Sequence, residues 1–127
     1  MRILLVEDEP AVREELCELF ELRGFAVRAV GDVRNAVRAL QEGWWPCALL
    51  TDFNLPDGSG LDLIRTIRHS LHLGPEVAPA LLMTGHTDLT EQVRLALAQE
   101  QVAMLTKPLD PTALLQMLSP APFGTSP

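Results

Sequence analysis

Five polar side chains in this sequence together have the composition of a phosphoryl-transfer site. They are two neighbouring acids, Glu7 and Asp8, a third acid, Asp52, the hydroxyl of Thr84 and the ammonium group of Lys107. Three carboxylates that meet repel one another, so such a site must take up a proton or a cation. Hard oxygen ligands favour Mg²⁺, and a phosphoryl group needs donors such as a hydroxyl and an ammonium group. One carboxylate is then left to accept the phosphoryl group.

Each of these residues follows a short apolar run, and helical patterns separate the runs. Strands are expected at 3–6, 25–30, 47–51, 80–83 and 102–105, and helices at 10–23, 33–42, 61–68, 89–99 and 111–118. This alternation predicts an α/β fold, with a parallel sheet, right-handed crossovers and helices on both faces. Open parallel sheets bind ligands beyond the carboxyl ends of their strands. The five side chains are therefore expected to converge at one edge of the sheet, from every strand except the second.

The composition limits the class of protein. The chain has 127 residues, 47% hydrophobic and 21% charged, which suits one domain with a real core. Its 10 Lys and Arg against 17 Asp and Glu give a net charge of −7, which disfavours nucleic-acid binding because phosphate neutralisation supplies most of that affinity. No apolar stretch is long enough for a membrane span or a signal peptide. With two buried free thiols expected at Cys17 and Cys47, we expect a cytoplasmic protein that contacts neither nucleic acid nor membranes.

The complete set of motifs resembles the receiver domain of bacterial two-component response regulators. The resemblance rests on Glu7-Asp8, the run DFNLPDGSG at 52–60, Thr84-Gly85 and Lys107-Pro108, in that order. It covers 2–118 and implies a flavodoxin-like, doubly wound five-stranded parallel sheet with strand order 2-1-3-4-5. The receiver domain is expected at 1–118, and the Pro- and Ser-rich residues 119–127 are expected to form a tail or the start of a linker.

The resemblance implies a role for each acidic residue. Asp52 is implied as the phosphoacceptor, which attacks the phosphohistidine of a sensor kinase in an in-line displacement. The reaction is expected to need Mg²⁺, held by Asp8, Asp52 and the backbone carbonyl of Asn54. Glu7 is expected to act through a metal-bound water.

Further residues are implied to bind the phosphoryl group or to set its lifetime. Thr84 is expected to bond one phosphoryl oxygen and Lys107 another, and the Lys107–Pro108 peptide bond is expected to be cis. Asn54 and His86 lie two residues beyond the acceptor and the hydroxyl, at positions that in the family tune how long the acyl phosphate survives. For His86, a solvated loop residue is an equally good interpretation.

The sequence departs from the family pattern on the signalling face. Met104 stands where the family usually carries an aromatic switch residue, and Glu100 replaces a glycine at the end of the fourth helix. Methionine is flexible and has no ring to lock in one rotamer. Glutamate adopts the left-handed conformation that caps a helix C-terminus less readily than glycine does. The final helix is also short. We hypothesise that coupling between phosphorylation and this face is weaker or differently routed.

The resemblance implies a phosphorylation-activated signalling domain that assists its own phosphorylation and dephosphorylation without being an enzyme. Expected partners are a sensor histidine kinase or phosphotransfer protein and a downstream effector domain or protein, while dimerisation and the length of the regulator are left open. A slow aspartyl-phosphate phosphatase is one alternative, but such enzymes commonly carry an acid where this chain has Asn54. The other is a structural module that has lost the switch, which the intact acids, hydroxyl and lysine oppose and Met104 weakly favours.

Overall fold

Five parallel strands form the central sheet of the molecule. The computed structural model describes residues 1–85 and 90–118. The strands are β1 (Arg2–Val6), β2 (Ala26–Val30), β3 (Cys47–Asp52), β6 (Val77–Thr84) and β7 (Ala103–Thr106), in the order β2-β1-β3-β6-β7. All neighbours pair in parallel. Without the small hairpin of β4 (Asn54–Leu55) and β5 (Gly58–Ser59), this is the order 2-1-3-4-5, so the expected flavodoxin-like topology is confirmed.

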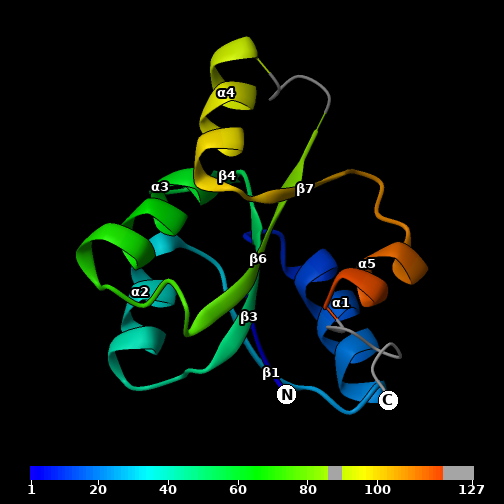
Figure 1. The fold of residues 1–127 in the computed structure, drawn as a ribbon. Helices are drawn as coiled ribbons and strands as arrows, with labels where there is room; N and C mark the ends of the chain where they lie inside the picture. The colour runs from blue at the N-terminus through cyan, green and yellow to red at the C-terminus, as the bar shows by residue number, and fades with distance from the viewer. Residues whose placement is uncertain (86–89, 119–127) are drawn as a thin grey trace, which may run out of the picture.

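Helices cover both faces of the sheet. They are α1 (Pro10–Leu22), α2 (Val33–Gln41), α3 (Gly60–Arg65), α4 (Glu91–Glu100) and α5 (Pro111–Leu118). Figure 1 shows α1 and α5 on one face and α2, α3 and α4 on the other. Side-chain hydroxyl and carboxylate caps fix the starts of three helices: Asp32 caps α2, Ser59 caps α3 and Thr90 caps α4.

Alternation along the strands divides the apolar core into two layers. In β1, Leu4 packs with the residues of α2 and α3, while Ile3 and Leu5 pack with those of α1 and α5. All six residues of β3 are buried, as expected for the central strand of a parallel sheet. The polar residues at the strand ends are thereby held on a rigid scaffold.

Two segments differ in kind from the expected elements, and β6 begins at Val77, three residues before the strand expected at 80–83. The residues 54–60 were expected to be a loop, but β4 and β5 pair there as an antiparallel hairpin, because the two residues 56–57 suffice for a tight connection. The third helix was expected to run to residue 68, but α3 ends at Arg65 and continues as the π-helical turn η1 (Thr66–Ser70). This wide turn keeps Ile67 buried while Arg68 and His69 reach α4.

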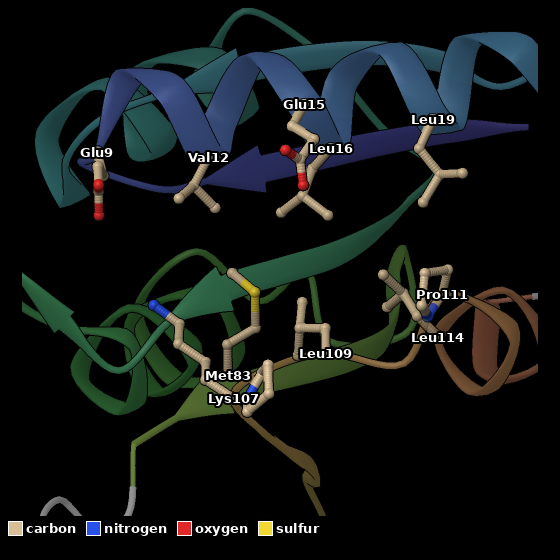
Figure 2. Close-up of a pocket in the computed structure, with 11 residues that line it drawn as sticks. Glu9, Val12, Glu15, Leu16, Leu19, Met83, Lys107, Leu109, Pro111 and Leu114 are labelled. Atoms are coloured by element: carbon tan, nitrogen blue, oxygen red, sulfur yellow. The ribbon is translucent and has the colours of Figure 1, made fainter.

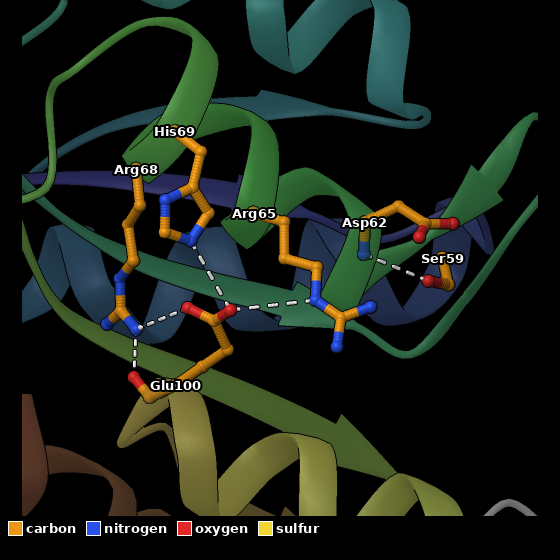
Figure 3. Close-up of polar contacts among 6 residues, drawn as sticks. All are labelled: Ser59, Asp62, Arg65, Arg68, His69 and Glu100. Atoms are coloured by element: carbon orange, nitrogen blue, oxygen red, sulfur yellow. Dashed lines mark hydrogen bonds and ion pairs between the residues drawn. The ribbon is translucent and has the colours of Figure 1, made fainter.

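The end of α4 is fixed by Glu100. Its carboxylate pairs with Arg65 (3.6 Å), Arg68 (3.4 Å) and His69 (3.4 Å), and Arg68 also donates to the Glu100 backbone carbonyl (Figure 3). Desolvation opposes ionisation of Glu100, but the hydrogen bonds and charges of His69 and Arg68 prevail and lower its pKa. The left-handed residue is Gln101, one position after the expected glycine site, with φ 56° and ψ 47°.

Two expectations about the class of protein can be compared with the structure. Cys17 and Cys47 are both free thiols, but only Cys47 is buried, so the expectation of two buried thiols is wrong for Cys17. Cys17 lies on α1, where its position is only partly covered by the core. Among residues 1–85 and 90–118, no helix has the length and apolar character needed to span a membrane.

Candidate functional site

Glu7, Asp8 and Asp52 come together at the carboxyl ends of the neighbouring strands β1 and β3. Each offers one carboxylate oxygen, and these three atoms lie within 4.8 Å of one another. The strand register explains this meeting: Val6 pairs with Thr51, so Glu7, directly after β1, lies beside Asp52, the last residue of β3. Glu7 is 1% exposed and Asp52 is 7% exposed, whereas Asp8 is open to solvent.

The environment of Glu7 disfavours a negative charge. Oε2 accepts a hydrogen bond from the Glu9 backbone N–H at 3.2 Å, but no described donor makes a hydrogen bond to the buried Oε1. Burial raises the pKa of Glu7 to about 7, and the nearby charge of Asp52 adds to this shift, while the Glu9 N–H and Lys107 oppose it. The three acids therefore form a cluster whose repulsion a cation would relieve.

Lys107 links Asp52 to Glu7. Its Nζ donates to Asp52 Oδ2 at 3.1 Å and lies 3.6 Å from Glu7 Oε1. Burial tends to lower the pKa of Lys107, but the two carboxylates outweigh burial and raise it. The backbone N–H of Lys107 donates to the Thr84 carbonyl at 2.8 Å, which fixes the start of the loop after β7. The Lys107–Pro108 bond is cis, so that expectation is confirmed.

Thr84 ends β6, the strand on the other side of β3. It is fully buried, and no described residue makes a hydrogen bond with its Oγ1. Asp52 pairs in register with Met83, so Thr84 lies one residue beyond the acidic end of the neighbouring strand. An unpaired buried hydroxyl costs about 1–3 kcal/mol. Such a group is suited to bond an acceptor that enters the site.

The hairpin after β3 is attached closely to the acidic site. The Phe53 N–H donates to the Met83 carbonyl at 2.9 Å, and the Gly60 N–H donates to the Phe53 carbonyl at 2.8 Å. A Cβ at Gly60 would collide with the Asp52 carbonyl oxygen and lie 2.6 Å from Leu82 Cδ1, so only glycine fits. Asn54 begins β4 within this hairpin, two residues after Asp52.

The structure adds two polar residues that the sequence analysis did not select. Arg13 Nη1 donates to the Glu7 carbonyl at 2.8 Å and so ties α1 to the acidic segment. Asp57, in the hairpin connection, accepts hydrogen bonds from the backbone N–H groups of Val33 and Arg34 in α2. The only sequence signal for Asp57 was its place inside the run 52–60, and Arg13 had none.

Of the two residues expected to modulate the switch, the structure describes Met104 but not His86. Met104 lies in β7, half-buried, and packs against the core layer beneath α2, α3 and α4. It pairs in register with Leu82 on β6, the strand that carries Thr84. His86 lies outside the described residues, so both interpretations of His86 stand as they were.

An apolar cavity of about 460 Å³ adjoins the site between α1 and the segment that leads into α5. Val12, Leu16 and Leu19 project from α1 toward Leu109 and Leu114 on the opposite wall (Figure 2). Lys107 belongs to the lining, whereas the three clustered acids do not. The cavity thus shares one residue with the acidic site but is separate from it.

Comparison with known proteins agrees with the fold and with the family resemblance. The family model described as the response regulator receiver domain matches residues 3–119. The chain is 34% identical over 114 residues to the phosphate regulon transcriptional regulatory protein PhoB of Klebsiella pneumoniae, covering 90% of this chain and 48% of that protein. It is 31% identical to the C4-dicarboxylate transport transcriptional regulatory protein DctD of Pseudomonas aeruginosa, covering 90% of this chain and 23% of that protein. The chain thus spans half or less of these curated relatives.

A solved structure with the same architecture is a response regulator receiver domain protein from Clostridium thermocellum. The two chains superpose with a TM-score of 0.80 at 26% sequence identity, over 94% of this chain and 92% of that one. The similarity therefore extends through nearly the whole of both chains, and it includes the sheet and the helices that position the acidic site.

Proposed function

The chain belongs to the response regulator receiver domain family, and from that premise we propose that it is a phosphorylation-activated signalling domain with Asp52 as phosphoacceptor. The observation that carries the proposal is the position of the Asp52 carboxylate, with Lys107 Nζ at 3.1 Å and oxygens of Glu7 and Asp8 within 4.8 Å. The donor is a sensor histidine kinase or a phosphotransfer protein in the cytoplasm. The chain is a regulatory domain rather than an enzyme with its own substrate.

The acidic cluster fits Mg²⁺. Three carboxylate oxygens lie within 4.8 Å of one another and form the hard donor set that this ion prefers. One of the three side chains, Glu7, is buried and has an oxygen, Oε1, with no described hydrogen-bond partner. Asp8, Asp52 and the Asn54 carbonyl would hold the ion, with Glu7 acting through a water. When bound, Mg²⁺ supplies positive charge beside the phosphoryl oxygens.

Asp52 acts as the nucleophile in this proposal. A carboxylate oxygen attacks phosphorus, the new O–P bond forms, and the P–N bond to the donor imidazole breaks with its electron pair returning to the nitrogen. Lys107 then bonds a phosphoryl oxygen, because its ammonium group already lies beside the acceptor. The Thr84 hydroxyl bonds a second oxygen and so gains the partner that no described residue provides.

The phosphoryl group acts as a switch by adding charge. A phosphoryl group brings about −1.5 to −2 charges at neutral pH. Lys107 and Thr84 lie at the ends of β7 and β6, so their movement toward this charge is transmitted to the α4–β7–α5 side of the sheet. The output is a protein-interaction surface. We propose that residues 1–118 form the receiver and that a downstream effector domain or protein recognises this surface.

Intact-mass measurement after incubation with acetyl phosphate and Mg²⁺ tests the proposal. We expect one phosphoryl adduct per chain, lost in Asp52→Asn and retained in Asp62→Asn, a control carboxylate on the exposed side of α3. Absence of any adduct would instead support a structural module. Rapid multiple turnover without adduct accumulation would support a phosphatase.

A further inference from the structure

Asp57 connects the hairpin that follows the phosphoacceptor to a helix remote in sequence. Its Oδ1 accepts from the Val33 N–H at 2.8 Å and its Oδ2 accepts from the Arg34 N–H at 3.0 Å. These donors belong to the first turn of α2, whose N–H groups have no partner within the helix. Both carboxylate oxygens of Asp57 thus accept hydrogen bonds from the same helix terminus, although Val33 and Arg34 are 24 and 23 residues away in the sequence.

The hairpin is held at both ends, with Asn54 between the two attachments. At its base, the Phe53 N–H donates to the Met83 carbonyl of β6, and the Gly60 N–H donates to the Phe53 carbonyl. At its tip, Asp57 bonds to α2, and a Cβ on Gly58 would lie 3.4 Å from Val33 Cγ2, so the hairpin also packs on this helix. The position of the Asn54 backbone therefore depends on the contact with α2.

We propose that Asp57 is a positioning residue, which fixes the Asn54 carbonyl for Mg²⁺ by anchoring the hairpin to α2. This inference rests on the proposed function, in which that carbonyl is a metal ligand. Although desolvation opposes it, hydrogen bonding to Val33 and Arg34 lowers the pKa of Asp57, so the anchor is ionised at neutral pH. Coupling between two sites is reciprocal, so Mg²⁺ must also stabilise the first turn of α2.

Asp32 provides a matched control within the same helix. Its Oδ1 accepts from the Asn35 N–H at 2.7 Å, so it also caps the first turn of α2 with a carboxylate. Asp32 directly precedes the helix and does not belong to the hairpin. Asp32→Ala therefore removes a cap from α2 without cutting the link to Asn54, whereas Asp57→Ala cuts that link.

Calorimetric titration of the whole chain with MgCl₂, without a phosphoryl donor, gives the first measurement. We expect Asp57→Ala to weaken Mg²⁺ binding about tenfold, at the low end of the range for residues that support metal ligands. Asp57→Asn should fall between this variant and the unsubstituted chain, because an amide oxygen still accepts one hydrogen bond. Asp32→Ala should change the Mg²⁺ affinity less than twofold, which is about the deviation from additivity found for substitutions at independent sites.

Amide hydrogen exchange gives the second measurement. Mg²⁺ should slow exchange in the first turn of α2 in the unsubstituted chain and in Asp32→Ala, but not in Asp57→Ala. Unchanged Mg²⁺ affinity in Asp57→Ala, or equal weakening in Asp32→Ala, overturns the inference while leaving the proposed function intact. The proposed function fails if the unsubstituted chain shows no saturable Mg²⁺ binding, or if Asp52→Asn binds Mg²⁺ as tightly as the unsubstituted chain. The inference then fails with it.

Discussion

Lys107 Nζ donates to Asp52 Oδ2 at 3.1 Å, so the acceptor carboxylate is already paired with the cation proposed to bind its phosphoryl group. Lys107 also lies 3.6 Å from Glu7 Oε1, so one ammonium group pairs with two of the three carboxylates. Phosphorylation would replace one anionic partner of this ammonium group by another with more charge. The ion pair is thus suited to both states of the domain.

Replacement of Lys107 by Ala should slow phosphorylation of Asp52. Loss of one preorganised donor to developing charge typically costs about 10²-fold in rate. Phosphorylation by phosphoramidate, followed by intact mass, measures this rate. Lys107→Arg is the control, since it keeps the charge but changes the compact ammonium group to a planar guanidinium. Equal rates in Lys107→Ala and the unsubstituted chain would contradict the assigned role.

Replacement of Thr84 by Val should leave the unphosphorylated domain as stable as before, or more stable. Valine has nearly the same shape, and it removes a buried hydroxyl that has no described partner. Removal of such a group can gain about 1 kcal/mol in the free energy of unfolding, which urea denaturation measures. The same substitution should shorten the life of the phosphorylated state, whereas Thr84→Ser should restore it. Destabilisation of the unphosphorylated Thr84→Val domain would show that the hydroxyl has a partner.

Glu7 should make the metal-free domain less stable as the pH rises toward neutrality. Burial raises its pKa to about 7 in the folded chain, from an ordinary value of 4.5. Between these values the folded state keeps a proton that the unfolded state has lost, so the stabilisation present at low pH disappears as the pH passes through about 7. In EDTA, Glu7 should contribute a slope of up to about 1.4 kcal/mol per pH unit to the unfolding free energy.

Glu7→Gln isolates this contribution, because glutamine does not titrate. The difference in unfolding free energy between the variant and the unsubstituted chain should therefore grow from pH 4.5 to about pH 7. Added Mg²⁺ should reduce the difference by favouring the ionised carboxylate. A difference that stays constant across this interval would mean that Glu7 titrates near its ordinary pKa.

Replacement of Glu100 by Gln should loosen α4 from α3 and η1. The substitution removes the charge that Arg65, Arg68 and His69 share, and partly exposed ion pairs of this kind contribute about 0.2–1 kcal/mol each. Amide exchange in α4 and η1 should become faster, and high salt should have the same effect in the unsubstituted chain. Glu91→Gln, at the other end of α4, serves as the control and should leave η1 unchanged.

Comparison of amide exchange with and without beryllofluoride tests the hypothesis about the signalling face. With Met104 in place of an aromatic residue and Glu100 holding α4, we expect a smaller response of α4 and β7 than the family shows. The double variant Met104→Tyr, Glu100→Gly should enlarge the response. A full response in the unsubstituted chain would show that neither residue limits coupling.

The parallel sheet and the meeting of the acids were predictable because they follow from short-range patterns, whereas the order of the strands was implied by the family resemblance. Apolar runs define the strands, and adjacent parallel strands bring the residues at their carboxyl ends together, as Glu7 after β1 and Asp52 at the end of β3 show. The position of Thr84 at the same edge follows from the same rule. These inferences need only periodicity and the topology of α/β sheets.

The remaining features depend on tertiary packing that no local pattern encodes. The bond from Asp57 to α2 joins residues 24 positions apart, and the need for glycine at residue 60 arises from the approach of the Asp52 carbonyl. The contact of Glu100 with Arg68 depends on the π-helical turn, which the helical pattern through residue 68 did not indicate. Contacts between side chains of elements distant in sequence therefore could not be predicted and are known only from the structure.

The location of Asp52 at the end of β3 limits which parts of the fold could move if this residue is phosphorylated as proposed. β3 is buried along its entire length between β1 and β6, and close-packed interiors resist displacement. This strand therefore cannot recoil when a bulky anion is added to its last residue. If Asp52 is phosphorylated as proposed, the surrounding loops and the outer strand β7 would have to move instead, and a chemical change at the centre of the sheet would lead to motion at its edge.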